Sequence, residues 1–176
     1  MEKKYILTDD VIDFNGYTLH RIKAVRDFDC VKAGDLGGFI ESEKNLDHDG
    51  DAWVTDSARV TGDAWVTGDA WVTGDAVVSG DALVTGDARV TSAAWVTGAA
   101  VVSGDADFAV ISGFGRVFRT TTFFRCKDNL VRCQCGCFYG TVDEFRSKVR
   151  ETHGSSKYAK EYLMITDLME LHFKED

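Results

Sequence analysis

The sequence predicts a mainly β protein built around a β-solenoid, with a β-hairpin cap before it and a small α+β unit after it. A six-residue phrase of the type Asp-Ala-Trp-Val-Thr-Gly repeats nine times between Asp51 and Gly104. Alanine and valine stand two residues apart in every repeat. A strict period of this kind is typical of short parallel strands wound into a coil. A hairpin signal upstream and helical periodicity downstream define the flanking units.

Residues 1–35 are expected to form the cap. Two β-prone segments, VIDF and YTLHRIKAV, flank Asn15-Gly16. This dipeptide tolerates the positive φ angles of a tight type I′ turn and therefore favours a hairpin. Such a hairpin would protect the first coil, whose strand edges and core are otherwise open.

Residues 36–113 are expected to form the solenoid, with Ala and Val pointing inward and Gly-Asp at the corners. Ile40 and Leu46 keep the six-residue step, but Leu46 and Val54 are eight residues apart. The sequence therefore predicts two inserted residues, in a wide corner near Asp47-His48-Asp49. The chain contains no proline, which suits strands that need every backbone N–H for pairing.

Residues 114–176 have the pattern of a separate α+β unit. The segments GRVF, TTFF and NLVRC are expected to be short strands. Thr141 and Glu144 match a capping box, which predicts a helix over residues 141–152. A second helix is expected over residues 157–173, because apolar side chains recur at helical spacing along one face: Tyr158, Tyr162, Ile165, Leu168, Met169 and Phe173.

Charge is concentrated in the repeat. Residues 47–107 contain 11 acidic and 2 basic residues, so their net charge of −9 equals that of the whole chain. Direct binding to nucleic acid is not expected, because it requires Lys and Arg to neutralise phosphates. No apolar run is long enough to span a membrane. Five cysteines without a framework pattern indicate the cytoplasm, and no cofactor motif is present.

The Ala-x-Val-Thr-Gly-Asp period over residues 36–112 resembles the hexapeptide-repeat superfamily. The resemblance implies a left-handed parallel β-helix with three hexads to a coil, and a homotrimer as the favoured assembly. DLGGFIESE (Asp35–Glu43) and GCFYGTVDEF with ETHG (Gly136–Gly154) also resemble uncharacterised bacterial and phage proteins with such repeats. That second resemblance brings no established activity with it, but it favours a role against a host macromolecule. We therefore expect a non-catalytic interaction or scaffold protein that binds or inhibits such a partner.

Many members of the superfamily are acyltransferases, so an enzyme is the alternative. The resemblance then implies a CoA- or nucleotide-dependent transferase whose site lies between subunits and uses a loop histidine. His48, in the wide corner, is the candidate for the general base. A histidine that only satisfies the turn explains the same position. A third alternative is sequestration of a small molecule between subunits.

Three hexads per coil would stack residues eighteen apart at about the 4.8 Å strand spacing. One exterior face then carries Trp53, Trp71 and Arg89, the candidate surface for ligand or partner recognition. Aromatic packing between coils would explain the same column. Another face carries only apolar residues, for which burial in a closed homo-oligomer is expected: Trp65, Leu83 and Val101.

One edge of the solenoid would carry an aspartate column: Asp51, Asp69, Asp87 and Asp105. Aspartate at a turn often binds its own backbone, but a charged column should also attract cations or a basic partner. A calcium ladder is an alternative for this column, but the dense acidic calcium motifs are missing. The Thr and Ser columns of the faces suggest an ice-binding surface as a further alternative, although their neighbouring columns hold Trp, Arg and Val. Between residues 51 and 87 the repeat would carry about one charge per 1.6 Å, close to about one per 1.7 Å in duplex DNA. A nucleic-acid-binding host protein is therefore a candidate partner.

The cysteines near the C-terminal end raise the question of a metal. Cys133, Cys135 and Cys137 follow Cys126, with His153 downstream, and soft ligands of this kind suit zinc. No C-x2-C knuckle is present, so no metal is predicted, with these three cysteines as the candidates if one binds.

Overall fold

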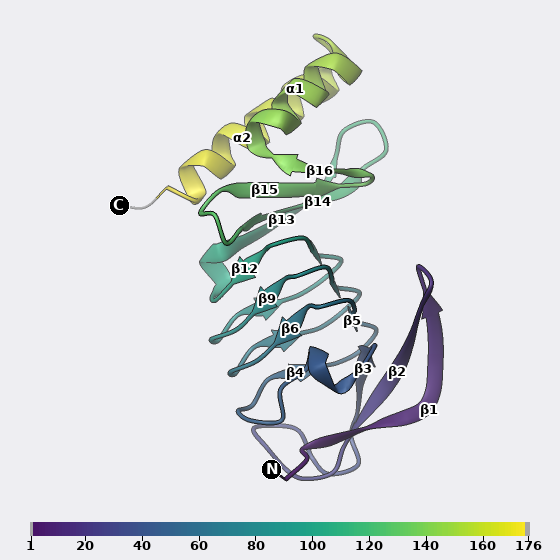
Figure 1. Ribbon diagram of the computed structural model, residues 1–176. Helices are drawn as coiled ribbons and strands as arrows, with labels where there is room; N and C mark the ends of the chain where they lie inside the picture. Colours follow the sequence, from purple (N-terminus) through teal and green to yellow (C-terminus); the bar gives the residue numbers. More distant parts are fainter. Residues whose placement is uncertain (1, 175–176) are drawn as a thin grey trace. The chain divides into compact units, whose positions relative to one another are not determined.

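The computed structural model describes residues 2–174 and divides the chain into two compact units, residues 1–105 and 106–176. The first contains a β-solenoid of about four turns, and the second combines a β-sheet with helices (Figure 1). The mainly β class and the helical C-terminal end are therefore confirmed. No helix within residues 2–174 is long and apolar enough to cross a membrane.

The solenoid is made of two-residue strands that recur every six residues. Their second residue is always valine, and every one of these valines is buried together with the alanine two positions before it. The strands are β4 (Trp53–Val54), β5 (Arg59–Val60), β6 (Trp65–Val66), β7 (Trp71–Val72), β8 (Val77–Val78), β9 (Leu83–Val84), β10 (Arg89–Val90), β11 (Trp95–Val96) and β12 (Val101–Val102).

Every third strand pairs in parallel, so that residues eighteen apart are neighbours, as the repeat predicts. Trp53 pairs with Trp71 and Trp65 pairs with Leu83. The strands therefore form three faces, which we name by their order: β4-β7-β10, β5-β8-β11 and β6-β9-β12. Within the nine repeats the inward positions are all Ala or Val, so the interior there contains small and medium side chains.

Corner geometry explains why glycine recurs at the end of the phrase. Gly80 has φ 71°, and a Cβ there would stand 2.9 Å from the backbone nitrogen of Gly98 in the next coil. Asp56 and Ser92 occupy equivalent positions with φ 55° and 61°. At Asp56 the carboxylate accepts a hydrogen bond from the Gly74 N–H at 3.2 Å, which helps to hold this turn.

The predicted insertion is present. Leu46 forms an isolated bridge with Val66, twenty residues away rather than eighteen. The two extra residues therefore lie between Leu46 and Trp53. The short 3₁₀ turn η1 (Glu43–Asn45) precedes this corner, and the buried Asn45 amide donates to the backbone oxygens of Gly62 and Ala64.

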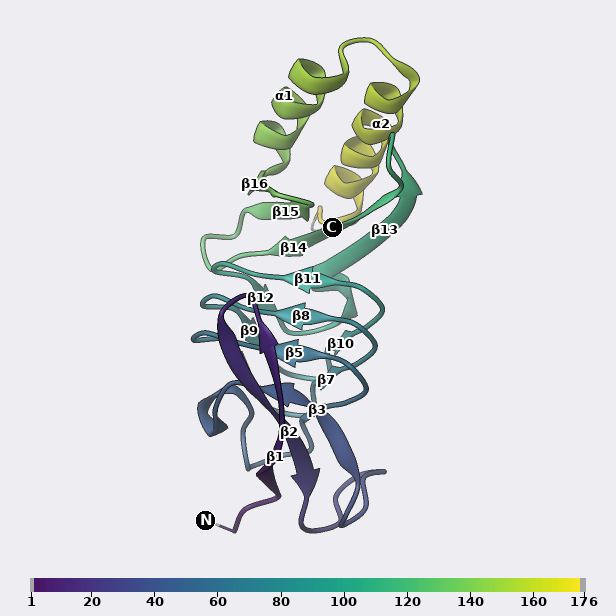
Figure 2. The ribbon, with the colours of Figure 1, turned by 90° about the vertical axis from the view of Figure 1, so that its right-hand side faces the viewer.

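An N-terminal hairpin extends one wall of the solenoid. Strands β1 (Tyr5–Phe14) and β2 (Tyr17–Ala24) are antiparallel around Asn15-Gly16, whose φ angles are 53° and 85°. Strand β2 pairs with β3 (Leu36–Ile40), and β3 pairs in parallel with β5. Figure 2 shows the resulting single sheet from the hairpin through β3, β5, β8 and β11.

The second unit begins earlier than predicted. Solenoid pairing ends at β12, and a 3₁₀ turn, η2 (Asp105–Asp107), spans the division. Residues 108–113, expected in the solenoid, belong to a strand of the second sheet. That sheet is antiparallel, in the order β13 (Phe108–Phe114), β14 (Arg119–Arg125), β15 (Val131–Cys135) and β16 (Phe138–Thr141).

The expected strand at GRVF is a turn between β13 and β14 instead. Gly115 has φ 74° and Phe118 has φ 53°, angles that interrupt an extended backbone. The segments TTFF and LVRC do lie within or overlap strands β14 and β15, respectively. Periodicity alone could not separate the turn from a strand because Val117 and Phe118 are β-prone residues that here face solvent.

Both predicted helices are present, as α1 (Val142–His153) and α2 (Lys157–His172). The capping box is confirmed: Glu144 N–H donates to the Thr141 hydroxyl at 3.3 Å, and Thr141 N–H donates to the Glu144 carboxylate at 2.7 Å. The predicted apolar face of α2 is partly wrong, since Tyr158 and Leu168 are exposed. The core between sheet and helices includes Phe123, Cys133, Phe145, Tyr162, Ile165 and Met169.

Candidate functional site

The N-terminal cap covers Trp53, so this residue is not part of an exposed recognition surface. Its side chain is only 2% exposed, and its ring meets those of Phe28 and Tyr5 edge-on at centroid distances of 5.3 and 6.3 Å. Trp71 is half-buried and Arg89 is exposed. The column is formed as predicted, but only its Trp71 and Arg89 end is available to a partner.

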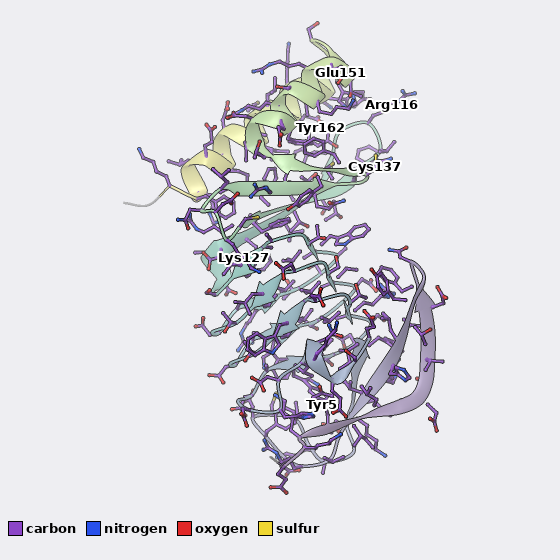
Figure 3. All side chains as sticks on the ribbon, in the orientation of Figure 1. Tyr5, Arg116, Lys127, Cys137, Glu151 and Tyr162 are labelled. Atoms are coloured by element: carbon purple, nitrogen blue, oxygen red, sulfur yellow. The ribbon has the colours of Figure 1, made fainter. Side chains whose placement is uncertain are left out.

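His48 lies against the cap, where it fixes the wide corner. Its ring stacks on Tyr5 at a centroid distance of 4.3 Å, and its Nδ1 accepts the Lys4 N–H at 3.4 Å. Its Nε2 is buried, 3.8 Å from a carboxylate oxygen of Glu43. These contacts favour the turn histidine over the general base of a transferase. Figure 3 shows Tyr5 at this N-terminal end of the first unit.

Lys4 is a buried amine in the same corner. The side chain is fully buried, and its Nζ donates to the backbone oxygens of Gly50 at 3.2 Å and Asp49 at 3.4 Å. Burial lowers the pKa of Lys4 to about 8, although the nearby Asp47 carboxylate opposes the shift. No sequence pattern predicted this contact, because it joins residues that the cap brings together.

The face of β6, β9 and β12 carries the predicted apolar strip. Trp65 is 46% exposed, and Leu83 and Val101 are half-buried. The face of β5, β8 and β11 differs because the hairpin lies against it. There the Arg59 guanidinium stands 5.0 Å from the centre of the Phe14 ring. The strip on β6, β9 and β12 is thus an apolar solenoid surface open to solvent, although Trp95 on the β5-β8-β11 face is also exposed.

The aspartate column is present and remains largely unneutralised. Asp69, Asp87 and Asp105 are exposed, whereas Asp51 is half-buried. The Asp69 carboxylate accepts the Asp51 N–H at 3.4 Å, and that of Asp105 accepts the Arg89 N–H at 3.1 Å. None of the three exposed carboxylates forms an ion pair within the described residues.

On a neighbouring edge of the solenoid, an aspartate is neutralised by a lysine. Asp63 lies 2.9 Å from the Lys44 Nζ, and this pairing lowers the pKa of the Asp63 carboxyl. Among residues 2–174, no basic side chain forms such an ion pair with Asp69, Asp87 or Asp105. Hydrogen bonds from backbone N–H groups orient the carboxylates of Asp69 and Asp105 but leave their negative charge facing solvent.

The cysteines are not gathered into a metal site. Cys133 is fully buried in the core of the second unit, and burial raises the pKa of its thiol. Cys135 is 9% exposed, and Cys137 is exposed after the strand has turned. Within residues 2–174, no group of three or more His, Cys, Asp or Glu side chains is placed to hold a metal ion.

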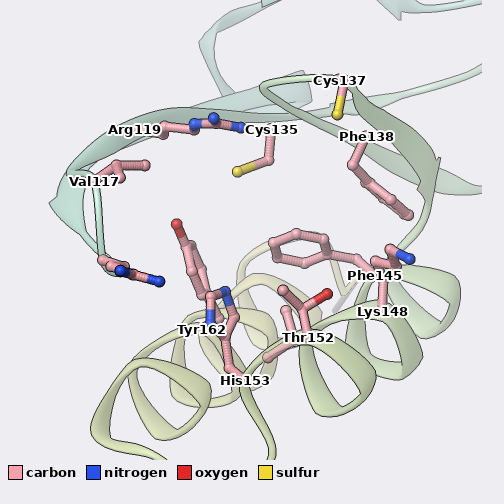
Figure 4. A pocket seen from close by; sticks show the side chains of 12 residues that line it. Val117, Arg119, Cys135, Cys137, Phe138, Phe145, Lys148, Thr152, His153 and Tyr162 are labelled. Atoms are coloured by element: carbon pink, nitrogen blue, oxygen red, sulfur yellow. The ribbon is translucent and has the colours of Figure 1, made fainter.

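Cys135 and Cys137 instead line a cavity of about 310 Å³ in the second unit. Figure 4 shows the Tyr162 hydroxyl and the Arg119 side chain at this cavity, with Phe138 and Phe145 beside it. Its walls come from the β13–β14 turn, the β15–β16 turn and both helices. The sequence prediction missed it, because no motif links residues that the fold collects from four segments.

The cavity wall is basic and aromatic. Arg116, Arg119 and Lys148 contribute cations, and no Asp or Glu is among the lining residues. The His153 and Tyr162 rings stack at a centroid distance of 6.0 Å. Burial, together with the neighbouring Cys135, raises the pKa of Tyr162 to about 12, so its hydroxyl keeps its proton at neutral pH.

A scan against protein-family models and a search of curated protein sequences gave no match to this chain. The structure alone therefore defines the class: a β-solenoid protein with a hairpin at its N-terminal end and an α+β unit after it. Two surfaces remain as candidate sites, the acidic column on the solenoid and the basic cavity in the second unit.

Proposed function

We propose that this chain is a non-catalytic interaction protein whose solenoid binds a basic surface of another macromolecule. The observation that carries the proposal is the column of Asp69, Asp87 and Asp105, which is exposed and forms no ion pair within the described residues. The chain surrounds it with little positive charge, since the repeat region contains only two basic residues.

Repulsion between the carboxylates of this column favours the binding of a cationic partner. Two carboxylates one strand spacing apart, about 4.8 Å, repel by about 0.9 kcal/mol in water. A cationic partner that aligns with the column relieves this repulsion at several steps at once and is also attracted from a distance. Hydrogen bonds to backbone N–H groups hold two of the carboxylates in place, so little side-chain order has to be gained on binding.

A nucleic-acid-binding protein is the partner class that best fits this charge spacing. A groove that follows DNA phosphates presents Lys and Arg at intervals set by about one charge per 1.7 Å of duplex. The repeat offers acidic groups at a similar density when its three edges are counted together, and the column supplies one carboxylate per coil, about 4.8 Å apart. The proposal therefore includes competition with nucleic acid for such a groove, which would make the chain an inhibitor of its partner.

The assembly that we propose is a homo-oligomer, with a trimer favoured by the resemblance to left-handed hexapeptide-repeat proteins. Support comes from the open strip of Trp65, Leu83 and Val101, because a contiguous apolar strip on an acidic protein is suited to burial against another copy. The acidic column lies on a different part of the coil, so burial of the strip would leave the column accessible.

The test compares two charge-matched triple variants. One replaces Asp69, Asp87 and Asp105 with Asn, and the other replaces three aspartates from the other two edges: Asp63, Asp75 and Asp81. Binding of a labelled 20-residue poly-lysine probe is measured by fluorescence anisotropy. We expect the column variant to lose at least tenfold in affinity and the control to retain most of it.

The same two variants serve as baits in a cell lysate, with mass spectrometry to identify what is retained. A basic protein retained by the wild type and the control but not by the column variant, and released by duplex DNA, supports the proposal. Equal losses in the two variants would mean that only net charge matters. That result would refute the column as the binding surface.

A further inference from the structure

The cavity of the second unit has a lining charge opposite to that of the chain. The protein carries a net charge of −9, yet three cations and no carboxylate line this cavity. Neither Arg116 nor Arg119 forms an ion pair within the described residues. Lys148 is the exception, since its Nζ lies 3.0 Å from a Glu151 carboxylate oxygen. Two guanidinium groups are therefore available to an anion.

The fold holds both arginines close to the cavity. Gly136 has φ 61°, and a Cβ there would collide with the Arg119 guanidinium, so this side chain lies directly across the glycine. Gly115 has φ 74°, and its Cβ would collide with the ring of Tyr162. Because Gly136 has no side chain, the Arg119 side chain can lie against it. Because Gly115 has none, the β13–β14 turn, which includes Arg116, can lie against the Tyr162 ring.

The remaining acid near this turn is already engaged. Glu161 accepts the Gly115 N–H at 2.9 Å and lies 3.5 Å from the Lys157 Nζ. It fixes the backbone of the turn and is not among the cavity's lining residues. The arginines therefore meet no carboxylate of their own unit at the cavity.

The other walls are aromatic and apolar. Phe138 and Phe145 lie with ring centroids 5.2 Å apart, and Phe145 meets the Tyr162 ring edge-on at 5.5 Å. The Tyr162 hydroxyl is within 3.5 Å of the Phe114 backbone oxygen. A volume of about 310 Å³ is at the small end of ligand sites, which suits one compact ring system rather than a polymer.

We infer that this cavity binds a small molecule that carries an anionic group on an aromatic ring. Arg116 and Arg119 would bind the anion, because guanidinium groups match carboxylate and phosphate oxygens in geometry as well as in charge. Phe138, Phe145 and the Tyr162 ring would receive the apolar part. This inference is independent of the acidic column, which lies in the other unit.

Isothermal titration calorimetry with 2-naphthyl phosphate tests the inference on the full-length chain. Two matched probes separate its parts: 2-naphthol has the ring without the charge, and inorganic phosphate has the charge without the ring. We expect 2-naphthyl phosphate to bind at least tenfold more tightly than either. Equal affinity for naphthol or for phosphate alone would overturn the inference.

The variants Arg116→Met and Arg119→Met locate the binding. Each removes hydrogen bonds to a charged group, for which a loss of about tenfold or more in affinity is expected. Arg150→Met is the matched control, because Arg150 is exposed on α1 and does not line the cavity. Thermal melting verifies that each variant is folded. Unchanged affinity in both cavity variants, or an equal loss in the control, would refute the site.

Discussion

Truncation of Trp53 to alanine should strongly destabilise the first unit. The side chain is 98% buried, since its exposed fraction is 2%, and it packs between the rings of Tyr5 and Phe28. A buried aromatic residue removes about 150–250 Å² from water, worth about 4–6 kcal/mol at about 25 cal/mol per Å². Alanine retains part of this area, so a loss of about 3–5 kcal/mol is expected.

Trp65 provides a matched control within the same repeat. It has the same neighbours in sequence, Ala before and Val after, but its side chain is 46% exposed. By buried fraction, Trp65→Ala should therefore cost about half as much as Trp53→Ala at low protein concentration. If copies associate through the strip that includes Trp65, the cost of its truncation should grow as the protein concentration is raised.

Chemical denaturation followed by circular dichroism measures both variants. For a unit of this size, each kcal/mol lost corresponds to about 4 °C or more in Tm, so a thermal scan should show a fall of roughly 12 °C or more for Trp53→Ala. Similar losses in the two variants at micromolar concentration would refute the view that the cap, rather than the repeat position, decides what each tryptophan contributes.

Two further predictions concern the polar contacts of Lys4 and Thr141. Burial lowers the pKa of Lys4 from 10.5 to about 8, so between these two pH values the unfolded chain binds more protons than the folded one, and the unfolding free energy should rise with pH. Urea denaturation should show this rise, up to about 3 kcal/mol, in the wild type relative to Lys4→Met. Parallel pH profiles of the two proteins would contradict the prediction. Thr141→Ala removes the hydroxyl that caps α1 and should lower the free energy of unfolding by about 1 kcal/mol. Thr141→Ser should retain most of the stability. Hydrogen exchange in the first turn of α1 should be faster in the alanine variant and unchanged in the serine variant.

The solenoid was predictable because its information is local and repeated. A period of six with three strands per coil leaves one register in which Ala and Val always face inward. The same arithmetic located the insertion after Leu46, since a break in period must be absorbed at a corner. Neither inference needed knowledge of distant contacts.

What the repeat could not predict is which of its surfaces is covered. Trp53 and Trp65 have the same local sequence, and only the position of the cap makes one buried and the other exposed. Lys4 and His48 likewise meet because the hairpin returns to the wide corner. These contacts depend on tertiary placement, for which the sequence pattern of a coil contains no signal.

The cavity was missed for a related reason. Arg116 lies within the segment GRVF, which was expected to be a strand, and Arg119 directly follows it. In a continuous strand, side chains three residues apart point to opposite faces. The turn formed by residues 115–118 changes their relation. Cys135 and Cys137 were singled out in the sequence, but as soft ligands for zinc rather than as part of a wall.

The equality of the coils also has a consequence for how the length of such a chain can change. Insertion or deletion of eighteen residues would add or remove one whole coil and leave every column in the same register relative to the cap. A change of six residues would instead shift all later columns by one face, so that the aspartates after it would continue a different edge. Length variation in steps of three hexads therefore preserves a binding surface. It would change the length of the acidic column without changing the residues that form it.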